Sequence, residues 1–306
     1  MIDLKEINEA RALSLPELMR LALEKKLANR GHQVSLCSII NAKSGKCSED
    51  CSFCVQSAHF RTDAPVYPLK DSEEIVAAAV EARKIGASRF SLVTSGRGMK
   101  GEEVRRVAGM IREIREKVGI KVCASLGIIG REDMGLLKDA GMSRYHHNLE
   151  TSREFFPKIV STHTFDERVE TILAAQEVGV EVCAGGIFGL GESEDDRISM
   201  AVTLSELRVD SVPINVLVPL PGTPLENMNP LTPEQVLRSI ALYRIIHPDV
   251  PIRLAAGRES VLQDFLGMAF MAGVDGMMIG GYLTQRGRQP EDDEKFVAAI
   301  KKIWTS

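Results

Sequence analysis

Three cysteines crowd into one short stretch, KCSEDCSFC at residues 46–54, with the spacing C-x3-C-x2-C. They are Cys47, Cys51 and Cys54, half of the six cysteines in the chain. Three thiolates can bind three irons of a four-iron cubane and leave the fourth iron open to a small molecule, whereas structural zinc takes four protein ligands. The odd number of thiols therefore favours an open iron–sulfur cluster.

Two other interpretations fit the same stretch. His59, five residues after Cys54, could complete a four-ligand zinc site. Alternatively, the three thiols could be reactive groups at the surface. Exposed thiols of low pKa oxidise readily, which disfavours the surface interpretation.

The elements that must hold this loop follow a repeated pattern. Five times a helix-like stretch ends in a glycine and is followed by a short apolar segment, and these glycines are Gly86, Gly119, Gly141, Gly179 and Gly273. Glycine readily adopts the left-handed conformation that ends many helices, so each instance predicts a helix followed by a strand. Further strands are predicted near 33–41, 210–217 and 250–256.

Eight strands alternating with helices predict a (β/α)8 barrel of the TIM type, in an α/β domain that spans residues 1–306. A helix is expected at about 15–30, before the first strand. A doubly wound open sheet is the alternative. Because barrel enzymes keep their chemistry at the carboxyl ends of the strands, the cysteine loop, which follows the first strand, is predicted at the rim of the barrel.

Strand alternation predicts which side chains face the lumen. Side chains point in turn to the two faces of a strand, so each barrel strand turns one set to the helices and the other inward. In IKVCASL the apolar set Val122, Ala124 and Leu126 meets the helices and leaves Cys123 inside. The other residues that this alternation places in the lumen are Cys37, Ser91, Lys121, Ser125, His146, Asn148, Cys183, Asn215 and Arg253. Such a lumen is polar and rich in sulfur, whereas Val, Ile and Leu usually fill it.

The bulk composition narrows the class of protein. A chain with 44% hydrophobic and 26% charged residues is typical of a packed globular protein. The net charge of -4 is spread over runs of mixed sign without a basic stripe, so nucleic acid is not an expected partner. No stretch is long and apolar enough to span a membrane. The charged, helix-periodic N-terminus fits no targeting peptide, so a cytoplasmic location, where thiols stay reduced, is expected.

The cysteine motif resembles that of the radical S-adenosylmethionine enzymes, and the resemblance extends over nearly the whole chain to the biotin synthase family. The blocks that carry it are CSEDCSFCVQS, YHHNLETS, STHTFDERVETI, CAGGIFGLGE, SVPINVLVPLPGTPL and IRLAAGRE. The resemblance implies a sulfurtransferase that inserts sulfur by radical chemistry into dethiobiotin to give biotin. It also implies that two molecules of S-adenosylmethionine are consumed for each product.

The resemblance implies a 4Fe-4S cluster on the three-cysteine loop, with its open iron binding S-adenosylmethionine. Phe53 would lie against the adenine, and the segment GGIFGLGE, which contains Ile187, would offer backbone groups to it. Asn148 and Glu150 would reach the ribose, and Arg168 would pair with the methionyl carboxylate as a bidentate fork. Arg168 could instead be a charge on a helix surface, and the four glycines of the segment could simply make a tight turn: Gly185, Gly186, Gly189 and Gly191.

The resemblance also implies an auxiliary cluster deep in the lumen that supplies the sulfur, usually held by three strand cysteines and an arginine. Cys123, Cys183 and Arg253 match three of these positions. The fourth position is Ser91 here, while Cys37 faces inward on the first strand. We interpret this as a swap that keeps three thiolates, although Cys37 could also be a small buried hydrophobe. The cluster could be the usual 2Fe-2S or a larger one, with Arg253 as ligand or as neighbour.

The substrate side departs from the family pattern at one position, because His146 stands where the family has asparagine. His146, Asn148 and Asn215 are the expected substrate contacts, and the Asn215 amide can both donate to and accept from a cyclic urea. The implied partners are dethiobiotin, a flavodoxin or ferredoxin with its reductase as electron donor, and a second copy in a homodimer. The rivals are another radical enzyme, such as a hydrogenase maturase, and a non-catalytic iron–sulfur carrier, which would need no cofactor pocket.

Overall fold

The computed structural model describes residues 4–281, 283 and 287–305. Two helices come first, α1 (Leu4–Ala12) and α2 (Leu15–Arg30), and α2 confirms the helix predicted at about 15–30. None of the helices in this described part is long and apolar enough to cross a bilayer.

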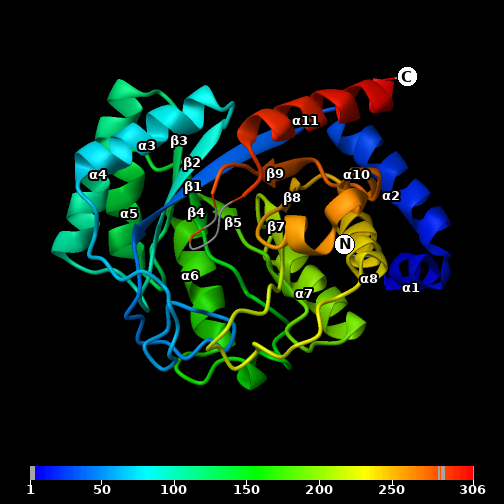
Figure 1. The fold of residues 1–306 in the computed structure, drawn as a ribbon, viewed down its shortest axis with the longest axis horizontal. Coiled ribbons are helices and arrows are strands. Elements are labelled where there is room, and N and C mark those ends of the chain that lie inside the picture. Colours follow the sequence, from blue (N-terminus) through cyan, green and yellow to red (C-terminus); the bar gives the residue numbers. More distant parts are fainter. Residues whose placement is uncertain (1–3, 282, 284–286, 306) are drawn as a thin grey trace.

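Strands and helices then alternate along the chain (Figure 1). The strands are β1 (Ser35–Lys43), β2 (Arg89–Thr94), β3 (Lys121–Ser125), β4 (Arg144–His146), β5 (Glu181–Cys183), β6 (Gly186–Phe188), β7 (Val212–Val216), β8 (Ile252–Leu254) and β9 (Gly276–Met278). The helices that follow α2 are α3 (Ser72–Lys84), α4 (Glu102–Lys117), α5 (Arg131–Asp139), α6 (Phe165–Glu177), α7 (Glu194–Glu206), α8 (Pro233–Ile246), α9 (Arg258–Val261), α10 (Leu266–Met271) and α11 (Pro290–Thr305). Two short 3-10 helices lie at Phe156–Lys158 and Gln263–Phe265. Figure 1 shows α3, α4 and α5 along one side of the strands and α2, α8 and α10 along the other.

The strands form one parallel sheet in the order β5-β4-β3-β2-β1-β9-β8-β7-β6. The two end strands are consecutive pieces of a single strand, interrupted at residues 184–185. Hydrogen bonds join β5 to the residues just before β7: the Ala184 amide donates to the Ser211 carbonyl at 3.0 Å, and the Asp210 amide donates to the Val182 carbonyl at 2.9 Å. The sheet is therefore a closed barrel, as predicted, and the open doubly wound alternative is wrong. The described residues contain nine strands instead of the predicted eight because the fifth strand is split.

The glycine signals located the elements correctly. All five glycines predicted to end helices have positive φ angles, between 71° and 108°. The strands predicted near 33–41, 210–217 and 250–256 correspond to β1, β7 and β8, whose bounds differ from these by a few residues. At the start of α8 the Thr232 side chain accepts from the amide of Gln235, which fixes where this helix begins.

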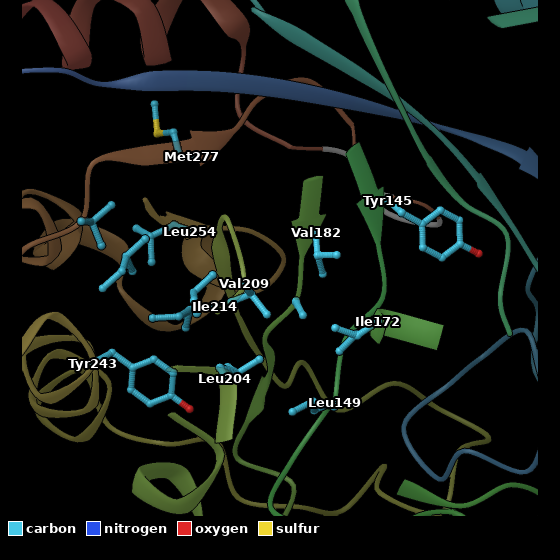
Figure 2. Packing of buried hydrophobic residues seen from close by; sticks show 14 of the residues in the cluster. Tyr145, Leu149, Ile172, Val182, Leu204, Val209, Ile214, Tyr243, Leu254 and Met277 are labelled. Carbon is cyan, nitrogen blue, oxygen red and sulfur yellow. The ribbon is translucent and has the colours of Figure 1, made fainter. Parts of the chain in front are cut away.

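An apolar layer lies between the strands and the helices (Figure 2). Its strand members include Tyr145, Val182, Ile214, Leu254 and Met277, each at most 1% exposed. Burying a side chain of this size stabilises the fold by about 1.5–3 kcal/mol, and a register slip of one residue would exchange this set with its polar neighbours. The apolar layer therefore fixes which neighbouring side chains face the lumen.

Candidate active site

The loop after β1 brings the first three cysteines together by backbone hydrogen bonds. The Cys47 amide donates to the Gln56 carbonyl at 2.9 Å, and the Ala58 amide donates back to the Cys47 carbonyl at 2.7 Å. The Cys54 amide donates to the Cys51 carbonyl at 2.9 Å, which closes a tight turn. In Figure 1 the loop of residues 44–71 continues from the arrowhead of β1, at the carboxyl end of the strand. The loop thus lies at the predicted rim of the barrel.

The electrostatics of these thiols fit an inorganic cation. Burial raises the pKa of Cys51 to about 12, and although Arg168 opposes this, Cys54, Glu150 and Cys47 add to it. Burial also raises the pKa of Cys54 to about 11. Three mutually repelling thiolates are unfavourable in this loop unless a positive core lies between them. An iron–sulfur cluster supplies such a core, so the donor set fits one.

The zinc interpretation has less support. The Nε2 atom of His59 lies 2.9 Å from the Ser48 carbonyl oxygen, so the ring is turned to the backbone. Within the ranges that the structure describes, no three or more His, Cys, Asp or Glu side chains converge as the ligands of a single metal ion. A cubane does not require that convergence, because each thiolate binds a different iron.

Three residues predicted to bind the cofactor lie together beside the loop. The Arg168 Nη1 atom donates to the Asn148 carbonyl at 2.8 Å and lies 3.7 Å from the Glu150 carboxylate. The Asn148 side-chain nitrogen donates to Glu150 at 3.3 Å. Arg168 is mostly buried, so it is not a helix-surface charge. Glu150 has a φ of 70°, a left-handed conformation that costs about 1–3 kcal/mol in a residue other than glycine.

A hydrogen-bonded chain that sequence reasoning missed connects the cysteine loop to this pocket. The Arg168 Nε atom donates to His163 Nε2 at 3.1 Å. Because arginine can only donate, the His163 proton resides on Nδ1, which donates to Glu49 at 2.6 Å. Glu49 lies between Cys47 and Cys51 and also accepts from Thr162 at 2.8 Å. The position of Glu49 inside the cysteine motif was the available signal for this link.

The glycines of CAGGIFGLGE are explained by close backbone approach and turns. A Cβ atom at Gly185 would lie 1.9 Å from the Pro213 carbonyl oxygen, and one at Gly186 would lie 2.4 Å from that of Glu150. Gly189 and Gly191 have positive φ angles. The Ile187 amide donates to the Glu150 carbonyl at 2.9 Å, and Ile187 and Phe53 are both half-buried. Contacts of Ile187 and Phe53 with adenine stay predictions.

The other three cysteines are buried in the barrel. Cys37, Cys123 and Cys183 come from β1, β3 and β5 and are at most 7% exposed. One internal cavity is lined by Cys37, Cys183, His146 and Arg253, among others. The predicted inward orientation of these four side chains is thereby confirmed.

Ser91 lies in the same interior. It is 2% exposed and pairs in register with Cys123 across β2 and β3. Its hydroxyl oxygen has no hydrogen-bond partner within the described residues. A buried hydroxyl without a partner is unusual, and it marks this side of the lumen as a place where a further polar group fits.

Arg253 is held at one end and unpartnered at the other. Its Nε atom donates to the Ser211 hydroxyl at 2.9 Å, while Nη1 is buried without a partner in the described part of the chain. Burial lowers the pKa of Arg253, but the thiols of Cys37 and Cys183 outweigh this effect and raise it. A guanidinium nitrogen left free beside two thiols fits an anionic thiolate-bound cluster, as donor or as ligand.

Two further arginines in the lumen were missed from the sequence. Arg89 Nη2 and Arg144 Nη2 both donate to the Glu181 carboxylate, at 2.9 and 2.8 Å. Strand alternation could have found them, because Arg89 precedes Ser91 by two residues and Arg144 precedes His146 by two. Burial raises the pKa of Cys123 and of Cys183, and the arginines oppose this effect, Arg89 and Arg144 at Cys123 and Arg144 and Arg253 at Cys183.

The predicted substrate contacts lie near the lumen. Burial, followed by Arg144, Arg253 and Arg89, lowers the pKa of His146 to about 3, so this ring is neutral at physiological pH. The Asn215 amide donates to the Gly186 carbonyl at 3.1 Å and accepts from the Ala256 amide at 3.1 Å. Asn215 therefore holds backbone segments together, and it retains one hydrogen and one lone pair for another group.

Comparisons with known proteins agree with this geometry. Residues 42–204 match the family model "Radical SAM superfamily", and residues 213–301 match "Biotin and Thiamin Synthesis associated domain". A biotin synthase from Pelotomaculum thermopropionicum is 53% identical over 287 residues, which cover 94% of this chain and 89% of the relative. One from Thermotoga neapolitana is 48% identical over 275 residues, with 90% and 98% covered.

Solved structures share the fold at lower identity. Methylornithine synthase matches with a TM-score of 0.81 and 21% identity, covering 97% of this chain and 91% of that one. The FeFe-hydrogenase maturase HydG from Carboxydothermus hydrogenoformans matches with a TM-score of 0.80 and 19% identity, covering 96% and 76%. These identities speak for the barrel fold alone.

Proposed function

The chain belongs to the biotin synthase family of the radical S-adenosylmethionine superfamily, and from this membership we propose how its own residues share the reaction. The enzyme inserts sulfur into dethiobiotin to give biotin and uses a 4Fe-4S cluster with S-adenosylmethionine. The observation that carries the proposal is the division of six thiols into two groups. Cys47, Cys51 and Cys54 form the rim trio, and Cys37, Cys123 and Cys183 form the lumen trio.

The rim trio holds the 4Fe-4S cluster. When bound, this cluster supplies the electron that cleaves S-adenosylmethionine to the radical that removes hydrogen from unactivated carbon. The cysteine loop leaves one iron position without a protein ligand, which suits a cofactor that binds through its amino acid group. Burial of the loop keeps water away from the reactive species.

The pocket beside the rim trio binds S-adenosylmethionine. Arg168 pairs with the carboxylate, and its own hydrogen bonds to Asn148 and His163 fix its direction. Glu150 and Asn148 reach the ribose hydroxyls, to which a carboxylate and an amide are suitable partners. Phe53 and the backbone at Ile187 contact the adenine.

The lumen trio, with Arg253, holds an auxiliary iron–sulfur cluster that donates the sulfur. Its buried thiols and the unpartnered Arg253 nitrogen support this assignment. Cys37 takes the place of the cysteine that Ser91 replaces, so the cluster is a 2Fe-2S or a larger core with altered geometry. A change of cluster type with a moved ligand is chemically reasonable because ligand position sets cluster geometry.

Dethiobiotin lies between the two clusters. His146 lines the lumen cavity and, being neutral, has one ring nitrogen that donates and one that accepts. Asn148 and Asn215 complete the polar contacts to the cyclic urea. A flavodoxin or ferredoxin delivers electrons, and a second copy of the chain forms a homodimer.

The whole chain acts as one domain in the cytoplasm. One closed sheet contains strands from both segments that match family models, which supports a single folding unit. Six free thiols suit a reducing compartment.

The deciding experiment counts clusters. The protein is reconstituted with iron and sulfide without oxygen, and iron and labile sulfide per chain are measured with absorbance and electron paramagnetic resonance spectra. Two distinct clusters, and biotin formed from dethiobiotin, S-adenosylmethionine and a reductant, are expected. A single cluster per chain would overturn the sulfur-donor assignment, and deoxyadenosine without biotin would indicate another substrate.

A further inference from the structure

A pocket opens at the amino-terminal end of the barrel, opposite the cysteine loop. Several lining residues stand at or just before the starts of neighbouring strands: Arg89, Lys121, Ser143 and Glu181. Arg115, near the end of α4, completes the charged part of the lining. We call this the inlet pocket. The amino-terminal end of a barrel normally contributes stability, so an open, charged pocket here calls for an explanation.

Arg89 borders both the inlet pocket and the lumen cavity, which Cys37 and Cys183 also line. Its Nη1 atom donates to the Ser143 hydroxyl at 3.0 Å and its Nη2 atom to Glu181 at 2.9 Å. These contacts are made by the tips of long side chains, and such side chains change rotamer without a change in the backbone.

The inlet pocket is electropositive. Arg89, Arg115 and Lys121 line it against the single carboxylate of Glu181, and Arg144 binds that carboxylate from the lumen side at 2.8 Å. A concave surface with an excess of one charge raises the local concentration of ions of opposite sign. Small anions are therefore drawn to a surface that lies one arginine away from the lumen thiols.

We propose that the inlet pocket binds a small inorganic anion, hydrosulfide, and admits it to the lumen trio. The inference rests on the proposed function, in which the lumen gives up a sulfur atom with each product and must regain one. The opposite end of the barrel is occupied by S-adenosylmethionine and substrate during the reaction. Arg89 and Arg144 swing away from Glu181 as the anion passes, and passage itself makes and breaks no covalent bond.

The test measures how fast a small anionic reagent reaches the lumen thiols in protein that contains no cluster. In cluster-free protein whose rim trio is replaced by alanine, Cys37, Cys123 and Cys183 are the remaining thiols. Their modification by negatively charged sulfonatoethyl methanethiosulfonate and by neutral methyl methanethiosulfonate is timed by mass spectrometry. In the same background, Lys121→Glu with Arg115→Glu reverses the pocket charge. Arg106→Glu with Arg112→Glu makes the same change on exposed positions of α4 outside the pocket.

The charge reversal at Lys121 and Arg115 is expected to slow the modification of the lumen thiols by the charged reagent about tenfold, since electrostatic attraction changes association rates by this order or more. The neutral reagent keeps its rate, which also shows that the barrel is intact. Lys121→Glu alone, at an exposed side chain, is expected to give a smaller slowing in the same direction.

Two results would contradict the proposal that the pocket is an anion inlet. Equal slowing by the pocket pair and the α4 pair would mean that net charge alone acts, and no slowing by the pocket pair would mean that anions arrive from the rim. Neither result depends on cluster loading. If the chain binds two clusters but the pocket variant labels at the normal rate, only the inlet proposal is wrong. If the chain binds one cluster, the proposed sulfur donor is wrong whatever the labelling shows.

Discussion

The rim trio and the lumen trio use the same side chain in opposite ways. The rim thiols come from one loop and are held by local backbone hydrogen bonds. The lumen thiols come from three different strands and meet only because the sheet closes. The ligands of a binding site can therefore be brought together by residue spacing within one loop, which is visible in the sequence. They can also be brought together by the register of neighbouring strands, which appears only with the fold.

The charges around the two trios differ as well. Beside the rim trio, Arg168 lies 3.7 Å from the Glu150 carboxylate and is linked through His163 to that of Glu49. This mixed setting suits a cofactor that carries both signs of charge. Around the lumen trio, Arg89, Arg144 and Arg253 supply positive charge beside the thiols, and this setting suits a thiolate-bound anion. The four predictions that follow separate these two settings.

The largest effect is expected from Cys51→Ala, which removes a rim ligand. The rim cluster should be lost, and deoxyadenosine and biotin should both fall below detection, while the lumen iron stays bound. Iron analysis and chromatography of the products measure this. Ser52→Ala changes the adjacent residue and should keep both clusters. Deoxyadenosine formation by the Cys51 variant would contradict the rim assignment.

Cys37→Ala should affect the lumen alone. We expect loss of the auxiliary cluster and of biotin, with deoxyadenosine still formed, because the rim pocket is untouched. Ser91→Ala is the matched control and should leave both clusters in place, since Ser91 makes no hydrogen bond through its side chain within the described residues. Equal iron content in the Cys37 variant and the wild type would refute the swap.

A smaller effect is expected from His163→Ala, which breaks the chain between Glu49 and Arg168. Loss of one charge-assisted hydrogen bond costs about 1.5 kcal/mol, so the Kd for S-adenosylmethionine should rise about tenfold. Equilibrium dialysis with cluster-loaded protein measures the Kd. Arg153→Ala removes an exposed ion pair with Asp166 and serves as control. An unchanged Kd in the His163 variant would show that Arg168 needs no anchor.

The smallest effect is expected on the stability of the fold at low pH, through Asp50, whose carboxylate attaches the rim loop to Ser161 and Thr162. Burial alone would raise the pKa of Asp50, but hydrogen bonds from Ser161 and Thr162 lower it from 3.8 to about 2. The carboxylate therefore stabilises the fold above pH 4, and this contribution is lost as the pH falls toward 2. The shift corresponds to about 2 kcal/mol, and we expect about 1 kcal/mol because solvent screens the group.

Urea unfolding of cluster-free protein tests the acid prediction. Asp50→Asn should be less stable than the wild type at pH 6, and the difference should shrink as the pH falls below 4. Asp63→Asn, at an exposed position of the same loop, should change little. A difference that stays constant from pH 6 to pH 2.5 would exclude the ionised carboxylate as its cause.

Much of the fold could be predicted because its signals are local. Glycine at a helix end and apolar alternation along a strand act within a few residues, so the barrel and the inward direction of Cys37, Cys183 and Arg253 followed from them. The split at residues 184–185 did not follow, since it arises where the Gly185 backbone approaches Pro213 on a neighbouring strand.

The missed parts of the site depend on distant pairs. His163 meets Glu49 across 114 positions, and Arg89 meets Glu181 across 92. No periodicity reports such a pair. Arg89 and Arg144 do carry the alternation signal, since each lies two residues before a side chain that is predicted to face inward, but the carboxylate that they share comes from a different strand.

The carboxylate of Glu49 makes two parts of the site depend on one another. It belongs to the loop that wraps the inorganic core, yet through His163 it also holds the arginine that faces the organic cofactor. These hydrogen bonds are already formed by the polypeptide itself, so the direction of Arg168 depends on the conformation of the cysteine loop. A substitution in that loop can therefore weaken the hold on the nucleoside without touching any residue that contacts it.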